Sequence, residues 1–212
     1  MNYSCVIVAA GSGSRTGLQY NKVFHEIDGQ TVVERSAANF IDDPDCKQVI
    51  IVINLDERKI FDDLKFNNKV EFTAGGDSRQ ESVFNGLQLV SQEYVMIHDG
   101  ARPFVSSDII ERIKDGLQEY KACVAMVKST DTIKVVKNSV IDHTPIRDTM
   151  YNAQTPQAFR TELIIESYIS LFNQNATVTD DAEAVEFTTD EEIFVVEGDY
   201  RNIKITTAED LE

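Results

Sequence analysis

Apolar and polar positions follow two alternating patterns over the first 127 residues. Short, mostly apolar runs are typical of strands buried on both faces of a parallel sheet. They occur at residues 6–10, 48–54, 93–97 and 122–127, with a more polar run at 69–73. Segments with apolar residues three or four positions apart predict helices at 31–40, 57–64, 77–90 and 110–117. Because strands and helices alternate, we expect an α/β fold with a mostly parallel twisted sheet covered by helices on both faces.

The pattern changes after residue 127. Residues 128–151 alternate apolar and polar positions without a helical period, which predicts an extended hairpin with a turn near Lys137, Asn138 and Ser139. A two-stranded hairpin is barely stable alone, so a symmetric partner subunit is its natural support. Beyond it we expect a helix at 161–171, a short helix capped by Asp180, and extended segments at 192–196 and 202–206.

The length and composition are those of one soluble domain, here residues 1–212 with 128–151 as a dimerising β-arm. The chain has 20 Lys and Arg against 36 Asp and Glu, a net charge of −16, which argues against binding to nucleic acid or anionic membranes. Cys5, Cys46 and Cys123 are far apart and odd in number, so we expect buried reduced thiols. No apolar run is long enough for a signal peptide or a membrane span, which predicts a cytoplasmic protein.

A glycine-rich loop, Gly11-Ser12-Gly13-Ser14-Arg15-Thr16-Gly17, follows the first apolar run. Glycines allow backbone N–H groups to approach an anion, and Arg15 and Lys22 add positive charge. The P-loop lysine is missing, and the third glycine comes one residue too late for a dinucleotide fingerprint. An ordinary turn between a strand and a helix is the alternative, but the two cations favour nucleotide phosphates.

Two other polar loops also follow predicted strands, one at Gly75-Gly76 and one at Asp99. Asp77 has Gln80 three residues later, the spacing of a capping box, and is expected to cap the next helix. Ligands bind at the carboxyl ends of parallel strands, so we expect the three loops to form one site.

Seven motifs then occur in order: A-A-G-x-G-x-R with Lys22 downstream, G-G-x-x-R-x-x-S-V, H-D-x-A-R-P, D-T-I-K, T-P-Q-x-F, T-D-D-A and N-I-K-x-T. Together they resemble the 2-C-methyl-D-erythritol 4-phosphate cytidylyltransferase family of non-mevalonate isoprenoid synthesis. The resemblance implies a Rossmann-like nucleotidyltransferase fold and a homodimer built through the arm. It also implies that CTP and a sugar-alcohol phosphate react with release of pyrophosphate. Mg²⁺ is expected mainly on the CTP phosphates, without protein ligands.

The same resemblance implies a role for each matching residue. The catalytic residues would be Arg15, Lys22 and Lys204. The CTP site would be formed by Ala9, Ala10, Gly11, Gly13, Gly76, Asp77, Arg79 and Ser82. The acceptor would contact Asp99, Arg102, Thr132, Arg147, Thr155 and Thr179, with Thr132 and Arg147 reaching the partner's site. A phosphomonoester is mostly dianionic at neutral pH and needs no general base, so His98 is expected to be structural.

Several alternatives stand beside these roles. Met150-Tyr151 is similar to the ribitol-5-phosphate cytidylyltransferases, whereas D-T-I-K and T-D-D-A favour the methylerythritol enzymes. The glycine spacing disfavours an NAD(P)-dependent oxidoreductase, and a non-catalytic nucleotide-binding protein is a further possibility. Asp99 could simply pair with Arg102, Thr179 fits helix capping, and Arg147 could be a solvated surface charge.

Overall fold

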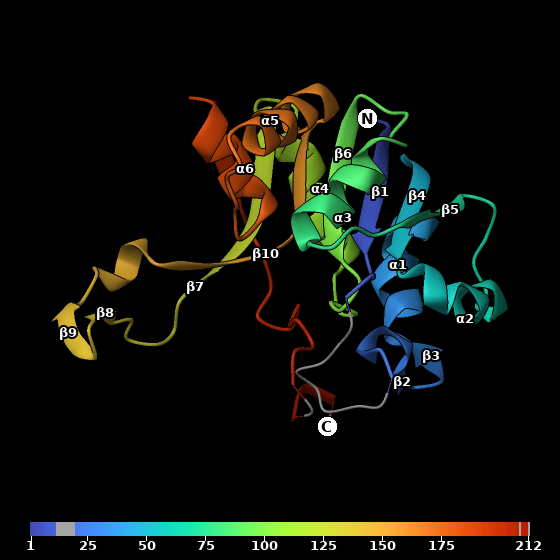
Figure 1. Cartoon of the computed structure of the whole chain (residues 1–212), viewed down its shortest axis with the longest axis horizontal. Coiled ribbons are helices and arrows are strands. Elements are labelled where there is room, and N and C mark those ends of the chain that lie inside the picture. The colour runs from blue at the N-terminus through green and yellow to red at the C-terminus, as the bar shows by residue number, and fades with distance from the viewer. Residues whose placement is uncertain (12–19, 208, 212) are drawn as a thin grey trace.

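A seven-stranded sheet forms the centre of the molecule, a computed structural model that describes residues 1–11, 20–207 and 209–211 (Figure 1). The strand order is β11-β7-β10-β6-β1-β4-β5, and β10 alone runs antiparallel to its neighbours. The strands of this sheet are β1 (Tyr3–Val8), β4 (Cys46–Ile53), β5 (Val70–Ala74), β6 (Tyr94–Asp99), β7 (Ala122–Lys128), β10 (Tyr151–Arg160) and β11 (Ile193–Glu197). The predicted α/β fold with a mostly parallel sheet is confirmed.

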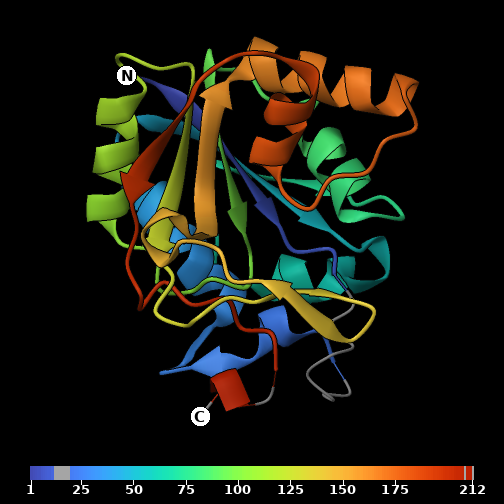
Figure 2. The ribbon, with the colours of Figure 1, turned by 90° about the vertical axis from the view of Figure 1, so that its left-hand side faces the viewer.

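Helices cover both faces of the sheet (Figure 2). The helices are α1 (Val32–Asp42), α2 (Arg58–Asp63), α3 (Arg79–Leu87), α4 (Ser107–Gly116), α5 (Thr161–Asn173) and α6 (Asp181–Thr188). One core packs apolar side chains of α1, α2 and α4 against the sheet, and a second packs those of α3, α5 and α6 on the opposite face. The strands are therefore buried from both sides, as their continuous apolar sequence requires.

Strand β10 was not predicted, because no strand was expected between the hairpin at 128–151 and the helix at 161–171. In the structure, residues 151–160 form a strand between β7 and β6. Its sequence, YNAQTPQAFR, contains Asn, Gln and Pro, which rarely occur in strands. The strand forms because the chain returning from the arm fills the position between β6 and β7, a long-range effect that local propensity does not reveal. The segment at 202–206, predicted as extended, forms no regular strand.

The helix caps show which local signals were interpreted correctly. Asp180 caps α6, as predicted: its carboxylate accepts a hydrogen bond from the Glu183 N–H at 2.9 Å. For α3 the prediction was wrong by one residue, because Ser78 is the N-cap and accepts from the Glu81 N–H at 3.1 Å. Asp77 precedes the cap, and its own N–H donates to the Glu81 carboxylate at 2.7 Å. Asp77 therefore lies in the loop that follows β5.

Two small ribbons lie outside the main sheet. One pairs β2 (Glu26–Ile27) with β3 (Gln30–Thr31), and the other pairs β8 (Val135–Lys137) with β9 (Val140–His143). The second ribbon belongs to residues 129–150, between β7 and β10, which we call the arm; the arm projects away from the body (Figure 1). Its turn is at Asn138 and Ser139, both with positive φ as in a tight hairpin turn, which confirms the predicted position.

The three cysteines are buried and free, as predicted. Among the described residues, no helix has the length and apolar character needed to span a membrane.

Candidate functional site

A cavity of about 480 Å³ lies where β1, β5 and β6 end. It is lined by Val8, Ala9, Ala10, Gly11, Lys22, Val23, Gly76, Asp77, Ser78, Arg79, Ser82, Asp99, Ala101 and Lys204. The predicted gathering of the three loops at one sheet edge is confirmed for the part of the glycine-rich loop that the structure describes. Gly13 and Arg15 lie outside the described residues.

The loop after β5 packs directly on the loop after β1. A Cβ atom added to Gly75 would overlap the Cβ of Ala10 and lie 3.0 Å from the Ser82 hydroxyl oxygen. Only glycine allows this approach. The Ser82 hydroxyl accepts a hydrogen bond from the Gly76 N–H at 3.0 Å, which fixes the turn above the cavity. The backbone of the Gly75-Gly76 turn therefore lies directly against Ala10 at the cavity.

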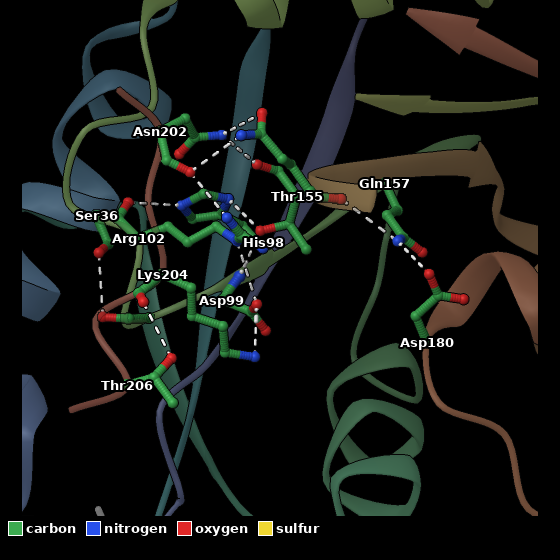
Figure 3. A network of polar contacts seen from close by, with 12 residues as sticks. Ser36, His98, Asp99, Arg102, Thr155, Gln157, Asp180, Asn202, Lys204 and Thr206 are labelled. Atoms are coloured by element: carbon green, nitrogen blue, oxygen red, sulfur yellow. Dashed lines mark hydrogen bonds and ion pairs between the residues drawn. The ribbon is translucent and has the colours of Figure 1, made fainter. Parts of the chain in front are cut away.

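Asp99 is the charged centre of the cavity floor. Its carboxylate lies 2.9 Å from the Lys204 ammonium and 3.4 Å from Arg102 (Figure 3). The Arg79 guanidinium lies 3.7 Å from the same carboxylate. Burial alone would raise the pKa of Asp99, but the positive charges of Lys204, Arg79 and Arg102 outweigh burial and hold that pKa well below its usual range. Asp99 is therefore ionised and surrounded by cations.

A hydrogen-bonded chain behind the cavity holds Asp99 in place. The Asp99 N–H donates to the Thr155 hydroxyl oxygen at 3.0 Å, and that hydroxyl lies 2.9 Å from His98 Nδ1 (Figure 3). His98 Nε2 lies 3.1 Å from the Arg102 carbonyl, which can only accept, so Nε2 carries the proton and Nδ1 accepts from Thr155. Burial lowers the pKa of His98 to about 4, so the ring is neutral near pH 7. His98 is structural, as expected.

The two lysines reach the cavity from opposite ends of the chain. Lys22 begins the short 3-10 helix η2 (Lys22–Phe24), and its ammonium donates to the Ile205 carbonyl at 2.6 Å. Lys204 lies one residue before that carbonyl and is bound to Asp99. The first turn after the glycine-rich loop is thereby joined to the C-terminal segment.

Arg79 forms a buried ion pair that the motifs did not indicate. Its guanidinium donates two hydrogen bonds to Asp181, at 3.0 and 2.7 Å. Asp181 is fully buried and also accepts from the Tyr168 hydroxyl at 2.6 Å. Burial alone would lower the pKa of Arg79, but the negative charge of Asp181 has the larger effect and raises that pKa above its usual value. The pair joins α3, which follows the cavity loop, to the first turn of α6.

The predicted residues that the structure describes divide into four groups. All of the CTP residues among them line the cavity, together with Lys22, Lys204 and Asp99. Arg102 and Thr155 lie behind it: the Arg102 guanidinium donates to the Asn202 carbonyl at 2.8 Å, and the Thr155 hydroxyl is used by Asp99 and His98. Thr179 lies outside the cavity lining, and its hydroxyl donates to Glu183 at 2.7 Å.

The remaining two predicted residues, Thr132 and Arg147, are on the arm. The Arg147 guanidinium donates to the Thr132 hydroxyl at 2.6 Å, and both side chains are exposed. Neither lines the cavity of its own chain. The structure therefore brings this pair together, but apart from the other predicted acceptor contacts.

The described residues contain no group of three or more His, Cys, Asp or Glu side chains that could hold a metal ion. In the cavity, Asp99 already has three cationic neighbours. A divalent cation at this site would therefore fit as a companion of a bound anion rather than in a cage of protein carboxylates.

The sequence model of one protein family, described as 2-C-methyl-D-erythritol 4-phosphate cytidylyltransferase, matches residues 3–212 of this chain. A relative with that name from Geobacillus thermodenitrificans is 40% identical over 216 residues, covering 100% of this chain and 94% of the relative. A second one, from Bacillus mycoides, is 40% identical over 214 residues, covering 99% of this chain and 94% of the relative.

Solved structures give the same result. The 4-diphosphocytidyl-2C-methyl-D-erythritol synthase of Anaerococcus prevotii superposes with a TM-score of 0.89 at 37% identity, covering 98% of this chain and 92% of that one. The 2-C-methyl-D-erythritol 4-phosphate cytidylyltransferase of Francisella tularensis superposes with a TM-score of 0.83 at 31% identity, covering 100% and 97%.

Proposed function

The chain belongs to the 2-C-methyl-D-erythritol 4-phosphate cytidylyltransferase family, and from this premise we propose how its residues share the work of the reaction. The enzyme joins CTP and 2-C-methyl-D-erythritol 4-phosphate to give 4-diphosphocytidyl-2-C-methyl-D-erythritol and pyrophosphate. A phosphate oxygen of the acceptor attacks the α-phosphorus of CTP. The bond from that phosphorus to the β-phosphate oxygen breaks, and pyrophosphate leaves with the electron pair.

The observation that supports these residue roles is the set of residues that lines the cavity. Two lysines from distant parts of the chain, Lys22 and Lys204, face glycine-rich backbone at the carboxyl edge of a parallel sheet. Backbone N–H groups and fixed cations are what a triphosphate requires. We assign the cytidine and its phosphates to this cavity, with Ala9, Ala10, Gly76 and Ser82 along the nucleoside.

The difficulty in this reaction is electrostatic. Two like unit charges about 4 Å apart repel by about 4 kcal/mol at an effective dielectric constant of about 20. Lys22 and Lys204 offset this repulsion as the phosphates approach, and they stabilise negative charge on the leaving pyrophosphate. Because the acceptor phosphate is mostly dianionic at neutral pH, no side chain has to remove a proton. His98 is neutral and fully buried, as expected if it does not act as a general base.

We propose Mg²⁺ as the companion of CTP, bound mainly to its phosphates. It would supply further neutralisation of the triphosphate. The side chains that would accept the Mg²⁺–CTP complex are the two cavity lysines, because the described residues supply no ligand cluster of their own.

We further propose a homodimer in which the arm of one subunit completes the acceptor site of the other. Three observations support it. First, Thr132 and Arg147 lie on the arm and do not line the cavity of their own chain. Second, the arm exposes four large apolar side chains, those of Val136, Val140, Ile141 and Ile146. Third, a two-stranded ribbon is barely stable unless it packs against another surface. Sedimentation equilibrium tests the dimer: we expect twice the 23.8 kDa chain mass, and a monomer at micromolar concentration would refute it.

We place the reaction in the cytoplasm, and the three unpaired, buried thiols support a reducing compartment. The experiment that tests the function is pyrophosphate release with CTP and Mg²⁺, with methylerythritol 4-phosphate and ribitol 5-phosphate offered in parallel. Turnover with the first acceptor alone is expected. Preference for ribitol 5-phosphate, or nucleotide binding without turnover, would contradict the proposal.

A further inference from the structure

Lys204 lies on a segment without regular secondary structure, residues 199–206, which we call the strap. Two of its side chains, those of Asn202 and Ile205, are fully buried, whereas Arg201 and Ile203 are exposed. The strap is thus attached to the body on both sides of Lys204. Beyond Lys204, the Ile205 N–H donates to the Ala101 carbonyl at 2.9 Å.

On the other side of Lys204, Asn202 forms the attachment (Figure 3). Its side-chain amide donates to the Thr155 carbonyl at 2.9 Å, and its backbone carbonyl accepts from Arg102 at 2.8 Å. Both partners also contact Asp99: Thr155 accepts its N–H, and Arg102 pairs with its carboxylate. Thr155 and Arg102 therefore hold both the strap and Asp99, the ion-pair partner of Lys204.

Gln154 completes the attachment from the neighbouring position on β10. Its side-chain amide donates to the Asp199 carbonyl at 2.8 Å and to the Asn202 carbonyl at 3.3 Å, so it binds both ends of the turn that begins the strap. Its oxygen accepts from the Asp199 N–H at 3.3 Å. A Cβ atom added to Gly198 would overlap that side-chain oxygen, so glycine at position 198 makes room for Gln154.

We propose that Asn202 and Gln154 are positioning residues that set the ammonium of Lys204 over Asp99 and hence toward the reacting phosphates. The proposal rests on the catalytic role of Lys204 stated above. It adds that the geometry of Lys204 is determined by a polar attachment to the returning strand of the arm rather than by local backbone structure.

The physical reason is preorganisation. A lysine on an unattached strap has a flexible four-carbon side chain on a mobile backbone, and ordering both during catalysis would raise the barrier. A displacement of about 1 Å can reduce the rate about a hundredfold. We therefore expect Asn202→Ala and Gln154→Ala each to lower kcat about ten- to a hundredfold, with a smaller change in the KM for CTP.

The experiment is a double-mutant cycle measured by pyrophosphate release. It compares Lys204→Met, Asn202→Ala, Gln154→Ala and each double variant with wild type, and checks every protein by its urea midpoint. Arg201→Ala is the matched control, because Arg201 lies on the same strap but its exposed guanidinium pairs with the Asp199 carboxylate. If Asn202 acts through Lys204, adding Asn202→Ala to Lys204→Met should cost little more.

The possible outcomes are distinct. A large loss in Lys204→Met with no further loss in the double variants supports the proposal, provided that Arg201→Ala resembles wild type. Fully additive losses, or wild-type kcat in both attachment variants, overturn it. Near wild-type activity of Lys204→Met would instead remove the proposed catalytic role of Lys204. Should Asn202→Ala fail to fold, Gly198→Ala replaces it in the double-mutant cycle with Lys204→Met. The added methyl group would overlap the Gln154 side-chain oxygen and displace Gln154.

Discussion

The cavity and the arm carry predicted site residues in opposite physical settings. In the cavity, Asp99 is buried among Lys204, Arg79 and Arg102. Arg79 also pairs with Asp181, and Arg102 also donates to the Asn202 carbonyl. On the arm, Arg147 and Thr132 bond to each other in solvent. The cavity is organised within one subunit, whereas the arm has no such support. This difference supports the proposed homodimer, in which a second subunit covers the arm.

The largest expected effect concerns the buried ion pair between Arg79 and Asp181. Asp181→Ala removes a fully buried carboxylate that accepts from Arg79 and from the buried Tyr168 hydroxyl, whereas Arg79 is 30% exposed and keeps Asp99 nearby. The free energy of unfolding should therefore fall by about 3–4 kcal/mol. Urea unfolding followed by circular dichroism measures this. The matched arm variant is Asp142→Ala, which removes an exposed carboxylate 3.2 Å from Lys137 and should leave the urea midpoint unchanged. Equal effects of the two variants would contradict the distinction between cavity and arm.

Catalysis should depend most strongly on Lys22. Lys22→Ala should reduce kcat about a hundred- to a thousandfold, because it removes a cation placed where charge develops. The fold should be retained, since Lys22 lines the cavity and belongs to neither of the two hydrophobic cores. Kinetics of pyrophosphate release give the result, with Lys59→Ala as a control for a lysine outside the cavity lining. Wild-type kcat would exclude the assigned role.

A smaller loss is expected from the arm. Arg147→Ala should raise the KM for methylerythritol 4-phosphate about ten- to a hundredfold, because one charged hydrogen-bond donor to the acceptor is lost. The KM for CTP should change little. His143→Ala, on the same arm, is the control. A rise confined to the KM for CTP would show that the arm serves the nucleotide instead.

The smallest effect is a pH dependence of stability. The pKa of Asp99 is lowered in the folded state, so its ion pairs stabilise the protein above the unfolded pKa of about 4. That stability is lost as the pH falls through the lower folded pKa. The difference in urea midpoint between wild type and Asp99→Asn should therefore shrink as the pH falls below about 4. A difference that grows toward acid would contradict the ionised state of Asp99.

Local sequence patterns were sufficient for elements whose stability is local or repetitive. The apolar runs of β1, β4, β6 and β7 and the cap at Asp180 have the expected positions. Strand β10 was missed because its polar sequence forms a strand only in the position between β6 and β7. The cap of α3 was misplaced because Asp77 and Ser78 are both good caps, and tertiary contacts decide between them.

In the candidate site, too, local features could be predicted from the sequence and long-range contacts could not. Its loops could be predicted because glycine after a buried strand is a local signal. The partners of those loops could not: Asp181, Tyr168, Gln154 and Asn202 meet the site through contacts between residues far apart in the chain. The contact of Thr155 and Arg102 with the acceptor stays a prediction, and the structure adds that both residues also hold Asp99 and the strap. A motif indicates that a residue belongs to a site, but not whether it touches the substrate.

The most direct test of the crossing arm uses mixed dimers. Lys22→Ala and Arg147→Ala subunits are unfolded together and refolded at equal concentration. Activity is measured at a concentration of methylerythritol 4-phosphate well below the raised KM, where both parent variants turn over slowly. If the arm crosses, each heterodimer contains one site with both residues intact, and random pairing should restore about a quarter of wild-type activity. If the activity stays at the level of the two parent variants, Arg147 serves its own subunit, and the shared site is wrong.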